Sequence, residues 1–445
     1  MIRSSQPTQS PGERVLVCGA RGFEAELGMD EDLVEARGLA VAAGAEVVGA
    51  GVLQRKPHPD SATLFGRGKV EEIHGHVQRF SPTAVVVDND LTPAQVRNLE
   101  KAWGVRVVDR SELILDIFAR RAQTRQARLQ VELAQNEYLA PRLKRMWTHL
   151  ERTEGAIGTR GPGETQLETD KRLLKKRILV LRDELREIEA RRLREVNSRS
   201  EQFTVGLVGY TNAGKSTLLN RLTGAREFVA DQLFATLDTR TRQWKLPDGR
   251  TVLLSDTVGF LQRLPHHLVS SFQATLEETL AADVLLHVID GSHPRAGAQI
   301  QAVEDVLATL SRNARSAILV FNKIDRLDDR IGLQLLRNGR AQEAVYVSAA
   351  TGEGLDRLAE AVAGRLDAQS ALVDVFVPVA DGRLDASVRR LARPIEDEMC
   401  PDGREHRLRV RLSEGALGSL RHAGGAALRL EVVAPARDGE AALER

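Results

Sequence analysis

Cysteine is scarce in this chain, and its scarcity limits the chemistry that the protein can carry. Cys18 and Cys400 are the only two cysteines among 445 residues. They lie far apart in the sequence and match no metal-ligand or redox spacing. A disulfide framework and a cysteine-ligated metal centre are therefore not indicated. We expect a reducing compartment and no disulfide-linked partner.

Long apolar runs are also missing. No stretch reaches the length of about 18 apolar residues that a membrane-spanning helix needs. The chain begins with polar residues, MIRSSQPTQSPGE, which lack the apolar core of a signal peptide. From these two absences we expect a cytoplasmic protein.

The chain lacks a strong excess of either charge. Its 63 Lys and Arg residues balance 62 Asp and Glu residues, which leaves a net charge of +1. A balanced total argues neither for nor against nucleic-acid binding, because it can hide a local excess. Such an excess exists between Arg110 and Ser200, where 21 basic residues face 14 acidic ones and the local charge is +7.

The length and the patterning predict several domains with an overall α/β fold. Apolar runs typical of strands alternate with helical patterns in residues 1–109 and again in residues 201–367, which predicts two α/β domains. In the second, the pattern is typical of a parallel, doubly wound sheet. Residues 371–435 predict a small α+β domain with three strands.

Residues 110–200 are rich in Leu, Arg, Glu, Gln and Ala, and they predict a long helical hairpin. One helix is expected from Ser111 to about Leu150 and another from Asp170 to Asn197. The loop between them, residues 151–169, contains four glycines and a proline and cannot be helical throughout. In the second helix, one apolar stripe suits a helix partner and consists of Leu174, Ile178, Leu181, Leu185 and Ile188.

A glycine-rich segment between an apolar strand and a helical run carries the strongest chemical signal. The segment reads Gly209-Tyr-Thr-Asn-Ala-Gly214-Lys215-Ser216, which has the Gly-x4-Gly-Lys-Ser spacing of a phosphate-binding loop. Such a loop offers backbone N–H donors to phosphates at a helix N-terminus, and the lysine neutralises the β and γ charges. The residues predicted to bind nucleotide here are Gly209, Tyr210, Thr211, Asn212, Ala213, Gly214, Lys215, Ser216 and Thr217.

A second strand, TVLLSD, ends at Asp256 and is followed by Gly259. Mg²⁺ between the β and γ phosphates takes hard oxygen ligands, which Ser216 offers directly and Asp256 supports. The DxxG spacing lets the N–H of Gly259 reach the γ phosphate. We therefore predict a Mg²⁺-nucleotide site, with Lys215 and Gly259 acting on the terminal phosphate.

The base is predicted from Asn322-Lys323-Ile324-Asp325, which follows the strand SAILVF. The carboxylate of Asp325 can accept two hydrogen bonds from the N1 and N2 edge of guanine, and adenine offers no such edge. Ser348 and Ala349 fit the loop that contacts the guanine oxygen. The sequence thus predicts GTP and GDP as ligands, rather than ATP.

Two features bear on the hydrolysis rate. A switch threonine is expected between the phosphate loop and Asp256; Thr236 is preferred over Thr239 and Thr241 as a catalytic residue and, with Ser216, as a ligand of Mg²⁺. Phe260 follows Gly259 at the position where many relatives of Ras carry a glutamine that orients water. An aromatic ring cannot do that, so hydrolysis is expected to be slow without a partner.

These motifs together resemble the translation-factor-related GTPases, and the segment ahead of them resembles the HflX family in particular. The resemblance rests on the run from Gly161 to Asp170, GPGETQLETD, ahead of GYTNAGKSTLLN, with FATLDTRTR, DTVGF and NKID following in order. It covers roughly residues 14–367. The C-terminal domain lies beyond it, and we assign that domain no chemistry.

The resemblance implies a GTPase that binds the 50S ribosomal subunit and splits or rescues idle or stalled 70S ribosomes under stress. It also implies that the loop of the hairpin approaches the peptidyl transferase centre, with ribosomal RNA contacts at Arg160, Gly161 and Gly163. The local charge of +7 suits a hairpin that binds an RNA backbone. It suits equally a solvated helix pair held by Arg–Glu pairs.

Three further hypotheses stay open at this point. Asn212 stands where some GTPases use an asparagine to help hold K⁺, which makes K⁺ a candidate second cation. The protein could act in ribosome assembly or RNA modification. It could also be a nucleotide-dependent signalling or scaffold protein with a peripheral membrane association.

Overall fold

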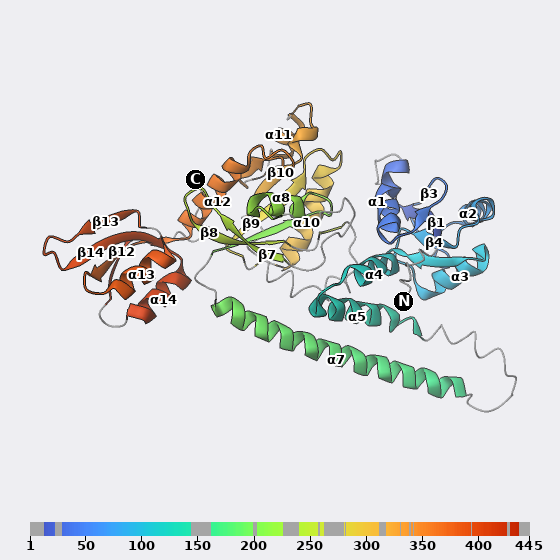
Figure 1. Cartoon of the computed structure of the whole chain (residues 1–445). Helices are drawn as coiled ribbons and strands as arrows, with labels where there is room; N and C mark the ends of the chain where they lie inside the picture. Colours follow the sequence, from blue (N-terminus) through green and yellow to red (C-terminus); the bar gives the residue numbers. More distant parts are fainter. Residues whose placement is uncertain are drawn as a thin grey trace, which may run out of the picture. The chain divides into compact units, whose positions relative to one another are not determined.

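The computed structural model describes residues 13–22, 29–143, 162–198, 203–225, 240–256, 259–261, 280, 282–310, 317–329, 331–337, 340, 342–392, 394–424 and 428–435. The chain divides into two compact units, the first consisting chiefly of Met1–Arg186 and the second chiefly of the residues that follow (Figure 1). Each unit is described separately below. No helix among the described residues is long and apolar enough to cross a membrane.

The first unit begins with a parallel sheet. Its strands are β1 (Arg14–Arg21), β2 (Glu46–Val47), β3 (Val52–Arg55), β4 (Ala84–Val87) and β5 (Arg106–Asp109). They follow the order β2-β1-β4-β5, with β3 paired to β1. The helices that connect them are α1 (Met29–Ala42), α2 (Arg67–Phe80) and α3 (Pro93–Trp103). The apolar runs of β1 and β4 are buried, as a parallel sheet covered on both faces requires. The predicted N-terminal α/β fold is confirmed.

The helices that follow are α4 (Arg110–Arg121), α5 (Arg125–Leu139) and α7 (Pro162–Ser198). Instead of one helix beginning at Ser111, the chain forms α4 and α5, because the Thr124 side chain accepts from Ala127 N and caps a new helix. Another difference is that α7 begins at Pro162, within the stretch predicted as a loop. Proline suits the first turn of a helix, where its missing N–H is no loss.

The hairpin between α5 and α7 is held by ion pairs and by part of the predicted apolar stripe. Arg177 binds both carboxylate oxygens of Glu132, at 2.7 and 2.8 Å. Leu181 and Leu185 are buried, and the other members of the stripe are partly buried. The predicted helical hairpin is confirmed.

The second unit contains a sheet of order β11-β10-β9-β6-β8-β7. The strands are β6 (Thr204–Gly209), β7 (Arg240–Lys245), β8 (Thr251–Asp256), β9 (Val284–Asp290), β10 (Ile318–Asn322) and β11 (Ala344–Tyr346). The helical elements are α8 (Lys215–Thr223), α10 (Ala296–Leu310), the 3-10 helix η3 (Ile324–Arg326), α11 (Ile331–Arg337) and α12 (Leu355–Ala368). The sheet is mixed rather than wholly parallel, because the unpredicted edge strand β7 runs antiparallel to β8.

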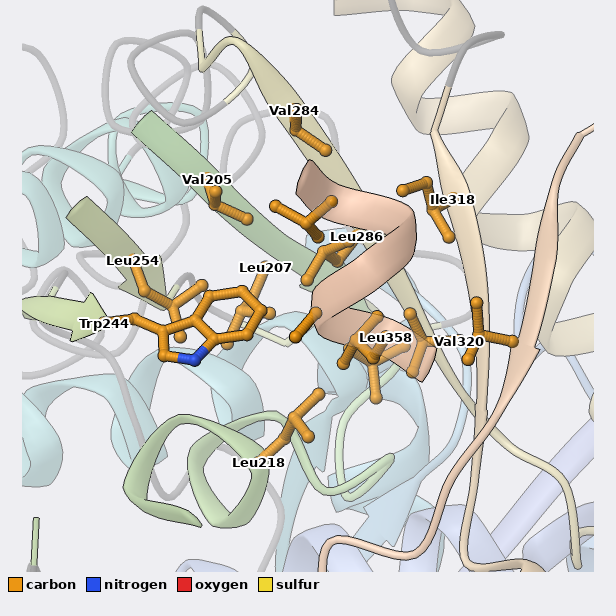
Figure 2. Packing of buried hydrophobic residues seen from close by; sticks show 14 of the residues in the cluster. Val205, Leu207, Leu218, Trp244, Leu254, Val284, Leu286, Ile318, Val320 and Leu358 are labelled. Carbon is orange, nitrogen blue, oxygen red and sulfur yellow. The ribbon is translucent and has the colours of Figure 1, made fainter. Parts of the chain in front are cut away.

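One face of this sheet forms a core with α8 and α12. Val205 and Leu207 of β6 lie beside Leu286 of β9, while Leu218 of α8 and Leu358 of α12 pack on them (Figure 2). Because these side chains are almost fully buried, the sheet is rigid where its carboxyl ends reach the loops. Those loops carry all the predicted nucleotide motifs of the second unit.

The remainder of the second unit is a small βαββαβ domain. Its elements are β12 (Ala371–Pro378), α13 (Gly382–Leu391), β13 (Glu396–Met399), β14 (Glu405–Leu412), α14 (Glu414–Gly424) and β15 (Arg429–Ala434). The strands form an antiparallel sheet of order β13-β14-β12-β15. The predicted α+β character is confirmed, but β13 was not predicted because its sequence, EDEM, has no apolar alternation.

Candidate nucleotide site

The phosphate loop leaves β6 through a glycine that no other residue could replace without strain. Gly209 has φ +152°, and a Cβ there would lie 2.2 Å from the carbonyl oxygen of Val288. Gly214 has φ +93° and caps α8, and its Cβ would lie 2.3 Å from Nδ2 of Asn322. Asn212, between them, is exposed and has φ +62°. The loop therefore curls tightly over the N-terminus of α8, where phosphates are bound.

Lys215 is folded back over this loop. Its Nζ donates to the carbonyl oxygens of Gly209, at 3.0 Å, and Tyr210, at 2.8 Å. Burial lowers the pKa of Lys215 to about 8, and the nearby charge of Asp256 opposes that decrease only in part. An anionic ligand would restore the charged form, so the lysine is poised to pair with a phosphate.

Ser216 and Asp256 form the pair on which the metal prediction rests. Ser216 Oγ donates to Oδ2 of Asp256 across 2.7 Å, and Asp256 is 1% exposed. A hydroxyl and a carboxylate are hard oxygen donors of the kind that Mg²⁺ prefers. The two residues fit Mg²⁺, with Ser216 as the direct ligand and Asp256 behind it. Thr236, the other predicted ligand, lies outside the described residues.

The end of the DxxG motif is joined directly to the phosphate loop. Phe260 N donates to Gly209 O at 3.1 Å, and Thr211 N donates to Phe260 O at 2.8 Å. A Cβ on Gly259 would lie 2.7 Å from Cγ2 of Thr211 and 3.1 Å from Nζ of Lys215. The Phe260 ring is 2% exposed, so it is part of the core and not of the reaction site.

The base-binding motifs converge on Asn322. Its Nδ2 donates to Ala213 O at 2.9 Å, and its Oδ1 accepts from Ala349 N at 3.0 Å. Ser348 Oγ donates to Oδ1 of Asp325 at 2.5 Å. One buried amide thus ties the phosphate loop to the loop that was predicted to contact guanine, and a hydroxyl orients the carboxylate predicted to read the base.

Asp290, the last residue of β9, was not among the residues predicted from the sequence. Lys323 has φ +64°, and its Nζ lies 2.6 Å from Oδ2 of Asp290, the last residue of β9. An acidic residue at the carboxyl end of a buried strand, beside the strand that leads to the base motif, was the available signal.

The predicted residues therefore fall into three groups. Those from Gly209 to Thr217 meet Asp256, Gly259, Asn322, Lys323, Asp325, Ser348 and Ala349 at the carboxyl ends of β6, β8 and β10 and in the loop after β11. Gly163 lies in the first turn of α7. Thr236, Arg160 and Gly161 are outside the described residues.

Comparison with known proteins gives matches along most of the chain. Family models described as GTP-binding GTPase N-terminal, GTP-binding GTPase middle region and 50S ribosome-binding GTPase match residues 30–119, 121–199 and 204–323.

Individual relatives cover the same parts. GTPase HflX of Escherichia coli (strain K12) is 46% identical over 86% of this chain and 90% of its own. GTPase HflX of Caldanaerobacter subterraneus subsp. tengcongensis is 44% identical over 84% of this chain and 86% of its own. A solved GTP-binding protein of Sulfolobus solfataricus in complex with GDP is 21% identical, covers 79% of this chain and 98% of its own, and has a TM-score of 0.42.

Proposed function

Because this chain belongs to the HflX family of GTPases, we propose that it is a cytoplasmic factor that binds the 50S subunit and dissociates or rescues idle or stalled 70S ribosomes. The chain is a GTP hydrolase. Its GTP form binds the large subunit, and hydrolysis releases it. The observation that carries the proposal is a complete set of nucleotide motifs in one chain with a basic helical hairpin.

The nucleotide half of the proposal is supported by how the site is joined together. Asn322 connects the phosphate loop to Ala349 through its amide, and Ser216 connects the same loop to Asp256. GTP bound in the phosphate loop would lie next to both Asn322 and Ser216. Mg²⁺, held by Ser216 and Thr236, would neutralise charge on the β and γ phosphates.

The ribosome half is supported by free positive charge on α7. Lys171, Arg172, Lys175 and Lys176 lie on two adjacent turns, and the last three are exposed. None takes part in an ion pair with another described residue, whereas Arg177 and Arg182 are paired to α5. Exposed cations with no ion-pair partner among the described residues suit an RNA backbone, where each phosphate contact releases a counterion. Arg160, Gly161 and Gly163 remain the proposed contacts near the loop.

Slow hydrolysis in the free protein follows from the buried Phe260. A side chain that is sealed in the core cannot orient the attacking water, and removing such a positioning group slows related GTPases strongly. The missing contribution would come from the ribosome, directly or by ordering the switch segment that contains Thr236. A cation held near Asn212 is an additional candidate, which comparison of rates in K⁺ and Na⁺ would test.

The proposal is tested by adding purified 50S subunits to the protein at a fixed GTP concentration. The expected result is co-sedimentation of the GTP-analogue form, but not the GDP form, with 50S subunits, and a hydrolysis rate raised at least tenfold. Equal rates with and without subunits, together with no co-sedimentation, would overturn it. Parallel flotation with anionic vesicles tests the membrane alternative.

A further inference from the structure

Thr211 is the third residue of the phosphate loop, and its hydroxyl is in an unusual position. The residue is 5% exposed, and its backbone N–H is already used in the 2.8 Å bond to Phe260 O. Its Oγ1 is buried and has no hydrogen-bond partner in the described part of the chain. Buried hydroxyl groups nearly always have a hydrogen-bond partner, because a buried hydroxyl without a hydrogen bond costs free energy.

The surroundings of Thr211 indicate what the partner is. The position of a Cβ on Gly259 lies 2.7 Å from Cγ2 of Thr211, 2.9 Å from its Cα and 3.1 Å from Nζ of Lys215. Thr211, Gly259 and Lys215 therefore meet at one point. In phosphate-loop GTPases the lysine and the DxxG glycine N–H both address the terminal phosphate of the nucleotide.

We propose that the Thr211 hydroxyl donates a hydrogen bond to an oxygen of the γ phosphate and so positions that group for attack by water. A phosphate oxygen is only an acceptor, and the hydroxyl supplies the hydrogen without transferring it. The contact exists with GTP and is absent with GDP, so it distinguishes the two nucleotides. The inference rests on the placement of GTP in the loop proposed above.

This contact also offers a reason why the chain functions with phenylalanine after Gly259. Because Phe260 is buried, no side chain at that position holds the terminal phosphate or its attacking water. A hydrogen bond from Thr211 would instead restrict the terminal phosphate beside Gly259 and Lys215. Thr211 is a positioning residue in this scheme, since the bond that breaks is between the γ phosphorus and the bridging oxygen.

The test uses the full-length protein with two substitutions. Thr211→Val keeps the branched shape and the methyl that touches Gly259 but removes the hydroxyl. Thr211→Ser keeps the hydroxyl and removes the methyl. The dissociation constants for GDP and for a non-hydrolysable GTP analogue are measured by fluorescence, and the hydrolysis rate is measured in a single turnover. A thermal melt of each variant reports folding.

The hydroxyl contact predicts that Thr211→Val loses about tenfold in affinity for the GTP analogue, the scale of one hydrogen bond to a charged group. Its GDP affinity stays within about twofold, and its single-turnover rate falls as well. Thr211→Ser should retain most of the analogue affinity. The proposal is overturned if Thr211→Val binds the analogue like the parent protein, or if both variants weaken GDP and the analogue equally.

Failure of this inference can be told apart from failure of the proposed function. Binding of the unsubstituted protein to 50S subunits is measured with the analogue at saturation. If that binding fails while Thr211→Val shows its selective loss, the ribosomal partner is wrong and the phosphate contact stands. If the unsubstituted protein binds 50S subunits and Thr211→Val shows no selective loss of analogue affinity, only the proposed role of Thr211 is wrong.

Discussion

The hydroxyl of Ser348 donates to Oδ1 of Asp325 across 2.5 Å, and this bond fixes the orientation of the carboxylate predicted to read the base. Ser348 is fully buried, and its Oγ also accepts from Thr351 N at 3.1 Å. A carboxylate held in this way presents its second oxygen in a defined direction. We therefore predict that selectivity for guanine depends on this contact between two loops that are separate in the sequence.

Replacing Asp325 by Asn should change which base is bound. A carboxylate accepts from both N1–H and the N2 amine of guanine, whereas an amide places one donor against a donor. We expect Asp325→Asn to weaken GDP binding by about 100-fold, the scale of one lost bond to a charged group together with a donor left without an acceptor. Xanthosine diphosphate, which has an oxygen in place of the amine, should bind better than GDP.

The measurement is competition of the two diphosphates against a fluorescent nucleotide. Asp290→Asn provides the control, because Asp290 contacts Lys323 and not the predicted base edge. It should weaken both diphosphates together without changing their order. An unchanged preference for GDP in Asp325→Asn would contradict the assignment of the base site.

A methyl group at Gly209 should destabilise the domain that binds the nucleotide. The Cβ of Gly209→Ala would meet Val288 O at 2.2 Å, and the φ of +152° is strained for any residue with a side chain. We expect a loss of about 3 kcal/mol in the free energy of unfolding, together with loss of nucleotide binding.

Gly364→Ala is the matched control for this substitution. Gly364 lies on the exposed side of α12, and a Cβ there would meet nothing within 4 Å. Alanine in a helix interior should leave stability unchanged or raise it by up to about 1 kcal/mol. Equal denaturation midpoints for the two variants would contradict the close packing of Gly209 against the carbonyl oxygen of Val288.

Nucleotide affinity should fall as the pH rises above about 8. Burial lowers the pKa of Lys215 to about 8 from 10.5, so the free site increasingly loses its positive charge above that pH. A bound phosphate favours the charged form and raises this pKa, so binding takes up a proton above pH 8. We expect the GDP dissociation constant to rise up to about tenfold per pH unit there.

The lowered pKa of Lys215 makes the stability of the nucleotide-free protein rise with pH, whereas it makes nucleotide affinity fall. Because the folded pKa is depressed, the unfolded chain binds more protons between about pH 8 and 10.5, and stability contributed by Lys215 rises with pH across that window.

Titration calorimetry in buffers of different ionisation enthalpy measures the proton uptake on nucleotide binding. Lys215→Met should show none, and a parent protein that behaves the same way would refute the explanation.

Reversal of charge on α7 should weaken binding to the large subunit. Replacing Lys175 and Lys176 by Glu removes two exposed cations that have no ion-pair partner in the described part of the chain, and adds two anions. We expect at least a tenfold loss of affinity for 50S subunits and a flatter dependence on salt concentration. The same change at Arg383 and Arg390, which are exposed on α13, serves as a control of equal net charge. If both double variants lose affinity equally, general electrostatic attraction explains the binding and α7 has no special role.

The nucleotide motifs could be read from the sequence because their chemistry is local. A glycine with positive φ, a lysine and a serine must be consecutive to wrap one phosphate, and each motif follows an apolar strand that is easy to recognise. Strands β7 and β13 were missed because their sequences lack the apolar pattern by which the other strands were recognised. β7 reads RTRQWK and β13 reads EDEM, and both are edge strands in which most of the described polar residues are exposed.

Contacts between distant residues could not be predicted from one sequence. Nothing near Asn322 in the sequence indicates that its amide would join Ala213 to Ala349. The break before α5 depends on the Thr124 cap, whose sequence signal is weak within a run of good helix formers. Both features need the folded chain, because each depends on which backbone groups the fold leaves to be satisfied.

Sucrose-gradient sedimentation of 70S ribosomes tests the central claim most directly. Ribosomes are mixed with the protein and GTP, a non-hydrolysable analogue or GDP. With GTP or the analogue, the 70S peak should give way to separate subunits, and with the analogue the protein should travel with the 50S peak. With GDP the 70S peak should persist. Intact 70S ribosomes in all three samples, with the protein at the top of each gradient, would contradict the account.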